Sequence, residues 1–434
     1  MGKYLNQAFG LIRTQTAKDT YILFVGNLAS AFLGFIFTII VARVLSVSDF
    51  GIFSAASNLV VIFYSLYDLG LSGGLVNFVA ETFARGKIEE ERAYIKAAFL
   101  LRFMAYIILS AAVFIFARQV SSKFLATDDV RVAYWVVAIS FGFMFEGLFT
   151  PALQAEKKFF PSILVTGSIG IVRPLVAGVL ILLGGLTLSS ALLSYALGAA
   201  ASIFVGFAFV GIGFLFAKAT KEIYFRLVKF SGWLGVNRII SGVAGRLDIQ
   251  MLAAMVGATA TGLYSIPSRL TSFVTVLSSS FSAALAPRLA SFGDKKEEKK
   301  YIAKASLATG GIILAIICWI VVAKPFILLL FGQKYLEAVP IFQALTASMI
   351  PFVLAAVPST AIIYSIKKPV FIGAFSIYQL AAIFSLNLFL IPKFGVFGPI
   401  ITFAVVNSIL AVYTWAIVYK YYWSNPNNKT LISK

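Results

Sequence analysis

Eight ionisable side chains lie within long apolar stretches of the sequence. They are Asp68, Arg102, Glu146, Arg173, Arg238, Arg246, Asp248 and Arg269. A charged side chain in hydrocarbon costs about 2.5 kcal/mol or more, so such residues normally face a protein interior or an aqueous cavity and have partners there. Arginine stays charged and binds phosphate or carboxylate groups through a planar, two-point fork. These residues therefore indicate the binding of a large anion.

The eight residues divide into three predicted roles. Four arginines are predicted to line a cationic, substrate-binding cavity: Arg173, Arg238, Arg246 and Arg269. Three carboxylates are predicted to serve as counterions or to carry a coupling proton or sodium ion: Asp68, Asp248 and Glu146. A simpler interpretation pairs Arg246 with Asp248 or a neighbour. The side chain of Arg102 is expected to extend to the cytoplasmic surface.

The composition identifies the solvent of these segments. Hydrophobic residues make up 60% of the 434 positions and charged residues 12%, whereas a soluble domain has about a quarter charged residues. Mean hydropathy is +0.94, which predicts a polytopic, all-α membrane protein. The sequence has no histidine and a single cysteine. It therefore lacks the usual general base and the usual zinc and haem ligands, so we predict a transporter without catalytic residues, metal or cofactor.

Twelve apolar runs are long enough to span a bilayer. They cover approximately residues 20–44, 50–83, 93–117, 131–154, 161–183, 189–217, 229–257, 262–287, 302–331, 338–365, 369–391 and 397–423. The second run is too long for one straight span. Alternate connections contain 24 and 7 lysines and arginines, which places both termini in the cytoplasm. This distribution also indicates that the net charge of +19 serves to anchor the protein in the membrane rather than to bind nucleic acid.

A faint internal repeat predicts two six-helix lobes. VLSVSDFGIFS at 44–54 is matched by MVGATATGLYS at 255–265, and GKIEEERAYIKAA at 86–98 by GDKKEEKKYIAKA at 293–305. An even number of spans per half gives parallel repeats. The predicted organisation is an N-terminal lobe at 1–217, a cytoplasmic linker at 218–228, a C-terminal lobe at 229–423 and a cytoplasmic tail at 424–434.

The second apolar run has one polar face. Asn58, Ser65, Asp68 and Ser72 follow one another at spacings of seven, three and four residues, which places them on one side of a helix that must face the protein. Gly70, Gly73 and Gly74 lie in the same run. They are expected to allow either close approach of a neighbouring helix or a bend.

Several stretches resemble a known family. ARVLSVSDFGIFS at 42–54, LYDLGL at 66–71, GRLDIQMLAAMVG at 245–257 with GLYS at 262–265, and PRLAS at 287–291 are similar to Wzx-type polysaccharide or O-antigen flippases, members of the multidrug/oligosaccharidyl-lipid/polysaccharide exporter superfamily. Asp68 matches the aspartate of the family's DLG stretch. Arg246 and Asp248 match its RLD stretch, and Arg43 matches the basic residue that closes the first span.

The resemblance implies a MATE-like fold of two lobes around a central cavity. It further implies that undecaprenyl-diphosphate-linked oligosaccharides cross from the cytoplasmic to the periplasmic leaflet of the inner membrane by alternating access. Membrane lipids, a polysaccharide polymerase and glycosyltransferases are the implied partners. Two features differ from lipid II flippases: those proteins have fourteen spans and a deep arginine in the first span, where this chain has Asn27.

Two other functions are compatible with a polytopic membrane protein. A cation-coupled multidrug exporter would share the architecture, but its cationic substrates favour a cavity rich in carboxylates and aromatic residues. The predicted excess of buried arginine favours the flippase instead. A membrane-bound glycan polymerase or ligase commonly has a large periplasmic loop, and the longest predicted outer loop, at about 118–130, is short.

Overall fold

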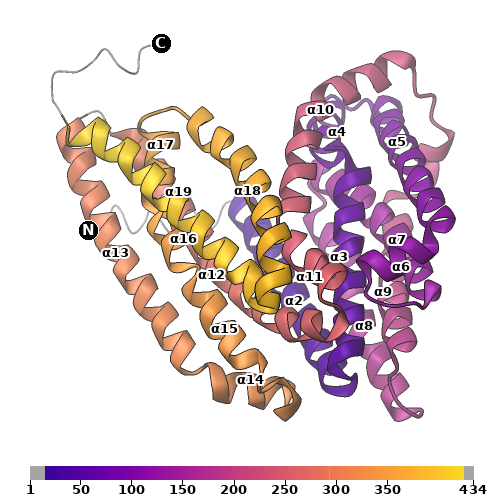
Figure 1. The fold of residues 1–434 in the computed structure, drawn as a ribbon. Helices are drawn as coiled ribbons and strands as arrows, with labels where there is room; N and C mark the ends of the chain where they lie inside the picture. The colour runs from indigo at the N-terminus through magenta and orange to yellow at the C-terminus, as the bar shows by residue number, and fades with distance from the viewer. Residues whose placement is uncertain (1–14, 293, 425–434) are drawn as a thin grey trace. The chain divides into compact units, whose positions relative to one another are not determined.

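The computed structural model describes residues 15–292 and 294–424, and all their regular structure is helical (Figure 1). Residues 1–14 and most of the predicted cytoplasmic tail, residues 425–434, lie outside this part of the chain. The described chain separates into two compact units, which meet in sequence between Arg246 and Leu247.

The first unit contains the following helices: α2 (Gln15–Val44), α3 (Val47–Asp68), α4 (Leu71–Ala84), α5 (Ile88–Ile115), α6 (Ala117–Phe124), α7 (Val130–Ala155), α8 (Phe159–Leu182), α9 (Leu188–Val210), η1 (Gly213–Phe216) and α10 (Lys221–Ala244). The second unit contains these: α11 (Leu247–Met255), α12 (Ala258–Ser291), α13 (Lys295–Val321), α14 (Ala323–Phe331), η2 (Gln333–Tyr335), α15 (Ala338–Ala347), α16 (Ile350–Leu354), α17 (Ala356–Tyr364), α18 (Val370–Phe394), η3 (Gly395–Phe397) and α19 (Gly398–Tyr422).

The helices confirm a polytopic membrane protein. Ten stretches of the described residues are long and apolar enough to cross a membrane. One of them, Val370–Tyr422, contains the two separate helices α18 and α19. The more polar α10 is a further helix of 24 residues that begins inside the predicted linker and covers much of the predicted seventh span. The arrangement is consistent with the twelve predicted spans.

The two predicted sequence repeats occupy equivalent places in the fold. Residues 44–54 run from the end of α2 into α3, and residues 255–265 run from the end of α11 into α12. Residues 86–98 lead into α5, and residues 294–305 lead into α13. Each half of the chain therefore has connections between helices at these corresponding positions, in the same order.

The predicted second span is broken into two helices. After α3 ends at Asp68, Leu69 and Gly70 adopt φ values of 50° and 73°, and α4 then begins at Leu71. This left-handed conformation costs a residue with a Cβ roughly 1–2 kcal/mol but suits glycine. The break places Asp68 at the end of one helix and Ser72 in the first turn of the next.

Small residues bring α10 close to α3 and α4. A Cβ on Gly74 would lie 2.3 Å from Ser231 Oγ, and one on Gly242 would lie 2.0 Å from Ser65 Oγ. A Cβ on Gly235 would lie 2.5 Å from the carbonyl oxygen of Leu69. The glycines of the second predicted span thus serve both close helix approach and a change of direction.

Because of the packing of α10, the boundary between the two units lies later in the sequence than the predicted linker. The sequence places the linker at 218–228 and assigns residues from 229 onward to the second lobe. In the structure α10 packs against α3, α4 and α5, and the division falls after Arg246. The difference arises because sequence order puts α10 at the start of the second repeat, while its small-residue face fits helices of the first unit.

Helix α7 holds a central position in the first unit. Asp129 caps its start, accepting hydrogen bonds from the backbone N of Arg131 at 3.0 Å and from Arg131 Nε at 2.9 Å. The hydrogen bonds from Arg131 hold the pKa of the Asp129 carboxyl below its ordinary value. Further along, Phe149 packs against Phe207 with ring centroids 5.0 Å apart. These contacts fix the helix that carries Glu146.

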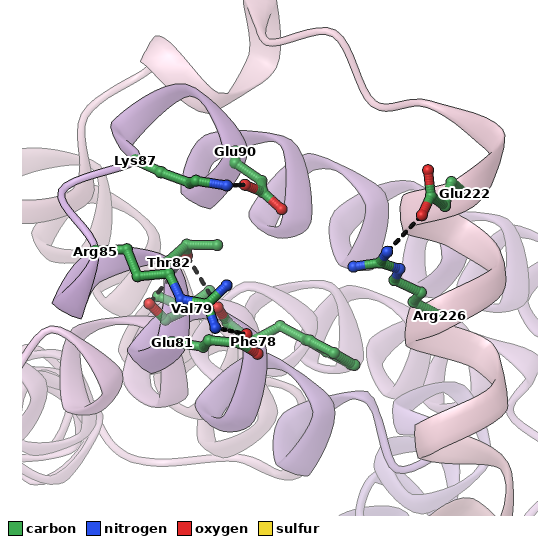
Figure 2. A network of polar contacts seen from close by, with 9 residues as sticks. All are labelled: Phe78, Val79, Glu81, Thr82, Arg85, Lys87, Glu90, Glu222 and Arg226. Atoms are coloured by element: carbon green, nitrogen blue, oxygen red, sulfur yellow. Dashed lines mark hydrogen bonds and ion pairs between the residues drawn. The ribbon is translucent and has the colours of Figure 1, made fainter.

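A polar surface lies where α4 turns into α5 and α10 begins. Figure 2 shows Glu81 with Arg85, Lys87 with Glu90, and Glu222 with Arg226. These side chains are at least one third exposed, and exposed pairs of this kind stabilise a protein by at most about 1 kcal/mol. Each pair joins residues three or four positions apart in the sequence and is exposed to solvent. None of these residues belongs to the buried ion pair of the first unit.

Candidate functional site

The first unit buries an ion pair between α3 and α5. Arg102 Nη2 donates a hydrogen bond to Asp68 Oδ1, and each side chain is only 1% exposed. Ser72 joins them: its hydroxyl donates to Asp68 Oδ1 at 2.6 Å and accepts from Arg102 Nη2 at 2.8 Å. The expectation that Arg102 extends to the cytoplasmic surface is wrong. The carboxylate of Asp68 compensates the charge of the buried Arg102 guanidinium directly, so this side chain is stable in the interior and does not extend to the surface.

A second arginine approaches the same carboxylate. Arg238 Nε on α10 lies 3.9 Å from Asp68 Oδ2, and its guanidinium lies over the ring of Tyr64, 5.3 Å from the centroid. Unlike Arg102, this side chain is 48% exposed. One carboxylate thus faces two guanidinium groups, so the cluster keeps a net positive charge at its exposed end.

A pocket opens beside Arg238, with a volume of about 280 Å³. It is lined by Tyr64, Ser72, Gly73, Val76, Glu146, Gly147, Thr150, Pro151, Gln154 and Arg238. All of these residues belong to the first unit, on α3, α4, α7 and α10. The pocket therefore combines one guanidinium, one carboxylate and several neutral polar groups.

Glu146 is the carboxylate of this pocket. Its Oε1 accepts hydrogen bonds from Thr150 Oγ1 at 3.3 Å and from Thr166 Oγ1 at 3.1 Å. Thr166 comes from the neighbouring helix α8. Within the described part of the chain, no lysine or arginine forms an ion pair with Glu146. Two hydroxyl groups hold one oxygen and leave the other available.

Two residues of α7 shape the wall of the pocket. A Cβ on Gly147 would lie 2.8 Å from Tyr64 Cε2, so glycine is needed for the Tyr64 ring to lie against this helix. Pro151 lies inside α7 and has no N–H to donate to the carbonyl oxygen of Gly147, four residues earlier. That carbonyl is therefore left without its usual helical partner.

Arg173 lies outside this pocket. Its guanidinium stacks over the rings of Phe37, at 5.4 Å, and Tyr195, at 4.8 Å, while Nε donates to the carbonyl oxygen of Ile169 at 3.0 Å. Gly198 makes room for the side chain, since a Cβ there would lie 2.5 Å from Arg173 Cγ. Aromatic contacts between α2, α8 and α9 thus position this arginine, away from the pocket-lining residues.

The remaining predicted site residues lie near or beyond the division between units. Arg246 is exposed, and its carbonyl oxygen accepts a hydrogen bond from Asn58 Nδ2 at 2.9 Å. Asp248 is buried and accepts a hydrogen bond from Tyr264 at 3.0 Å. Arg269 is half-buried on α12 of the second unit. Within the first unit, then, Arg238 and Glu146 line one pocket, and Asp68 lies behind it as the neighbour of Arg238.

Sequence reasoning missed the neutral members of the site. Thr150 and Gln154 follow Glu146 at intervals of four along α7, which is the spacing of one helix face. Tyr64 precedes Asp68 by the same interval on α3. The sequence shows this spacing. Neutral residues can be identified as candidate site residues, however, only once a carboxylate on the same helix face is known to lack a basic partner.

No three histidine, cysteine, aspartate or glutamate side chains gather closely enough to hold a metal ion in the described residues. The lining of the pocket offers hydrogen-bonding groups, one guanidinium and one carboxylate. Such a set is suited to binding a polar molecule.

Comparison with known proteins connects the fold to membrane transport. A Shigella flexneri protein named as an O-antigen transporter is 24% identical over 386 residues, which cover 84% of this chain and 88% of that protein. The lipid II flippase MurJ, in an inward closed conformation, superposes with a TM-score of 0.72 at 14% identity, covering 92% of this chain and 87% of MurJ.

An inward-facing multidrug resistance transporter of the MATE family, in the MOP superfamily, superposes with a TM-score of 0.71 at 11% identity. The match covers 90% of this chain and 94% of that transporter. At such identities the structures show a shared fold, which is MATE-like. The proteins compared are named as transporters or flippases rather than enzymes. Residues 16–293 match the family described as polysaccharide biosynthesis protein, and the chain belongs to that family.

Proposed function

We propose that the protein is a flippase for polyprenyl-diphosphate-linked oligosaccharides. It moves them from the cytoplasmic to the outer leaflet of the cytoplasmic membrane during surface polysaccharide synthesis. Membership of the polysaccharide biosynthesis family supports this proposal. The name of the Shigella flexneri relative and the fold shared with a lipid II flippase point in the same direction.

The position of Arg238 is the observation that carries the proposal. Its guanidinium is held by Tyr64 and Asp68 yet remains 48% exposed beside a polar pocket. Asp68 is already paired with the buried Arg102, so it does not fully neutralise Arg238. An exposed guanidinium whose position is fixed is suited to the two-point binding of a phosphate group.

The other predicted residues take supporting roles in this proposal. Arg173, Arg246 and Arg269 add positive charge along the path of the diphosphate, and Asp248 and Glu146 are candidates for carrying a coupling proton or sodium ion. Asp68 acts as the counterion of Arg102. Alternating access exposes the site first to one leaflet and then to the other. A polysaccharide polymerase and glycosyltransferases are the proposed neighbours, and both chain termini are cytoplasmic.

Export of drugs is the second candidate function. The fold shared with a multidrug resistance transporter favours it, and a carboxylate beside an aromatic ring, as in Glu146 and Tyr64, suits an organic cation. Against it stands Arg238, which lines the same pocket and repels cations.

Analysis of polyprenol-linked saccharides in a strain without the gene separates the two functions. We expect complete repeat units to accumulate in the cytoplasmic leaflet of this strain. The wild-type gene should reverse the accumulation, and a gene carrying Arg238→Ala should not. Unchanged surface polysaccharide and increased drug sensitivity would instead establish the exporter. The strain must lack a second flippase.

A further inference from the structure

We infer that the pocket around Glu146 is a recognition subsite for the first sugar of the lipid-linked substrate, and that it selects sugars rich in hydroxyl or amide groups over sugars that carry a carboxylate. This inference rests on the proposed function and specifies which part of the substrate the pocket reads.

The partners of Glu146 provide the first argument. Both are threonine hydroxyls, and both donate to the same oxygen, Oε1. A carboxylate that served as the counterion of an arginine would lie within salt-bridge distance of one, as Asp68 does. Oε2 of Glu146 instead makes no hydrogen bond or ion pair in the described residues. It is an acceptor that a ligand hydroxyl can use.

Neutral polar groups of the pocket provide the second argument. Gln154 and Tyr64 line the pocket, and neither the Gln154 amide nor the Tyr64 hydroxyl makes a side-chain hydrogen bond within the described chain. Pro151 leaves the carbonyl oxygen of Gly147 without its helical donor. Residues with hydrogen-bond donors and acceptors thus line the same pocket as an aromatic residue. Because each sugar hydroxyl both donates and accepts, this combination fits a sugar ring.

The arrangement also matches the covalent structure of the substrate. In a diphosphate-linked saccharide the first sugar is bonded directly to the diphosphate, so the site for the anion must adjoin the site for the sugar. Arg238 and Glu146 line one pocket. Its volume of about 280 Å³ is close to the lower limit of roughly 300 Å³ for small-molecule pockets, which suits a single sugar unit.

Charge explains the selection. A carboxylate on the sugar would lie beside the carboxylate of Glu146, in a partly buried pocket where like charges repel strongly. Hydroxyl and amide groups can instead donate to Glu146 Oε2, and hydrogen bonds to a charged group contribute more than those between neutral groups.

Binding to the purified full-length protein in nanodiscs tests the inference. The probes are undecaprenyl diphosphate and undecaprenyl-diphospho-N-acetylglucosamine, compared by native mass spectrometry. We expect wild type to bind the sugar-bearing lipid about tenfold more tightly, which corresponds to ~1.4 kcal/mol. Glu146→Ala should remove this preference, while Glu146→Gln, which keeps the shape and the threonine contacts, should reduce it. Glu81→Gln makes the same chemical change at an exposed carboxylate of α4 and should preserve it.

The outcomes separate this inference from the proposed function. Equal binding of both lipids by wild type, with loss of both in Arg238→Ala, would overturn the sugar subsite and leave the flippase standing. A preference that survives in Glu146→Ala would also overturn the subsite. Absence of binding to either lipid would contradict the proposed function itself.

Discussion

Asp68 and Arg102 form an ion pair inside the first unit, with both side chains 1% exposed. The pair joins α3 to α5 through residues 34 positions apart in sequence. Asp68 directly precedes the left-handed turn at Leu69 and Gly70. The same ion pair therefore fixes the end of α3, where α10 packs. Through Ser72 the pair also holds the start of α4, and both α3 and α4 contribute residues to the pocket.

Breaking this pair should destabilise the protein. We expect Arg102→Met to lower the free energy of unfolding by about 3–5 kcal/mol, because Asp68 is then left as a poorly compensated buried charge. The double variant Asp68→Asn/Arg102→Met should recover most of the loss, since neither charge remains. Equilibrium unfolding in mixed micelles measures both. A double variant no more stable than Arg102→Met would show that packing, rather than charge, causes the effect.

Two glycines of α10 offer a matched test of its packing. A Cβ on Gly235 would lie 2.5 Å from the Leu69 carbonyl oxygen, a backbone atom that cannot move aside cheaply, whereas one on Gly232 meets nothing within 4 Å. Gly235→Ala should destabilise the protein by about 1–3 kcal/mol. Gly232→Ala should be neutral or stabilise it by up to ~1 kcal/mol through helix propensity. Equal melting temperatures for the two variants would mean that α10 does not pack as described.

Removal of Arg238 should weaken binding of the diphosphate without unfolding the protein. A charge-assisted hydrogen bond contributes about 1.5–3 kcal/mol, so Arg238→Ala should lower the affinity for undecaprenyl diphosphate roughly 10- to 100-fold. Arg238→Lys should restore part of it, because lysine keeps the charge but lacks the two-point fork.

The control for Arg238 is Arg226→Ala, which removes an exposed arginine of the same helix that pairs with Glu222. We expect this variant to bind undecaprenyl diphosphate as wild type does. If both alanine variants lose affinity equally, the effect comes from the net charge of the protein, and Arg238 has no specific role.

Sugars with a carboxylate should reveal the charge of Glu146. Wild type should bind an undecaprenyl-diphospho-glucuronic acid more weakly than the corresponding glucose lipid, because Glu146 repels the acid. Glu146→Gln should narrow the gap between the two affinities. Native mass spectrometry with paired lipids gives the ratio directly. A gap that stays the same in Glu146→Gln would assign the selection to other residues.

Much of the fold could be predicted from composition and pattern. Apolar length gave the membrane spans, and the charged residues within them pointed to buried partners, as found for Asp68. The glycines at 70 and 74 indicated close helix packing. These features are local, so a single segment of sequence is enough to recognise them.

Pairing and boundaries could not be predicted in the same way. Nothing in the apolar run around Arg102 shows that Asp68, on another helix, lies within hydrogen-bond distance. The packing of α10 depends on complementary small residues such as Gly74 and Ser231, which are far apart in sequence. The pocket around Glu146 likewise combines residues from four helices, and its neutral members have no charge that singles them out.

Transfer of a lipid-linked sugar across a bilayer tests the central claim most directly. Vesicles reconstituted with the purified protein would contain undecaprenyl-diphosphate saccharide with a fluorophore on its sugar, and dithionite added outside would quench the exposed label. We predict that wild-type vesicles lose fluorescence from both leaflets, as Glu81→Gln vesicles do, while Arg238→Ala vesicles lose it mainly from the outer leaflet. If wild-type vesicles retain the inner-leaflet signal as protein-free vesicles do, the protein does not flip this class of lipid.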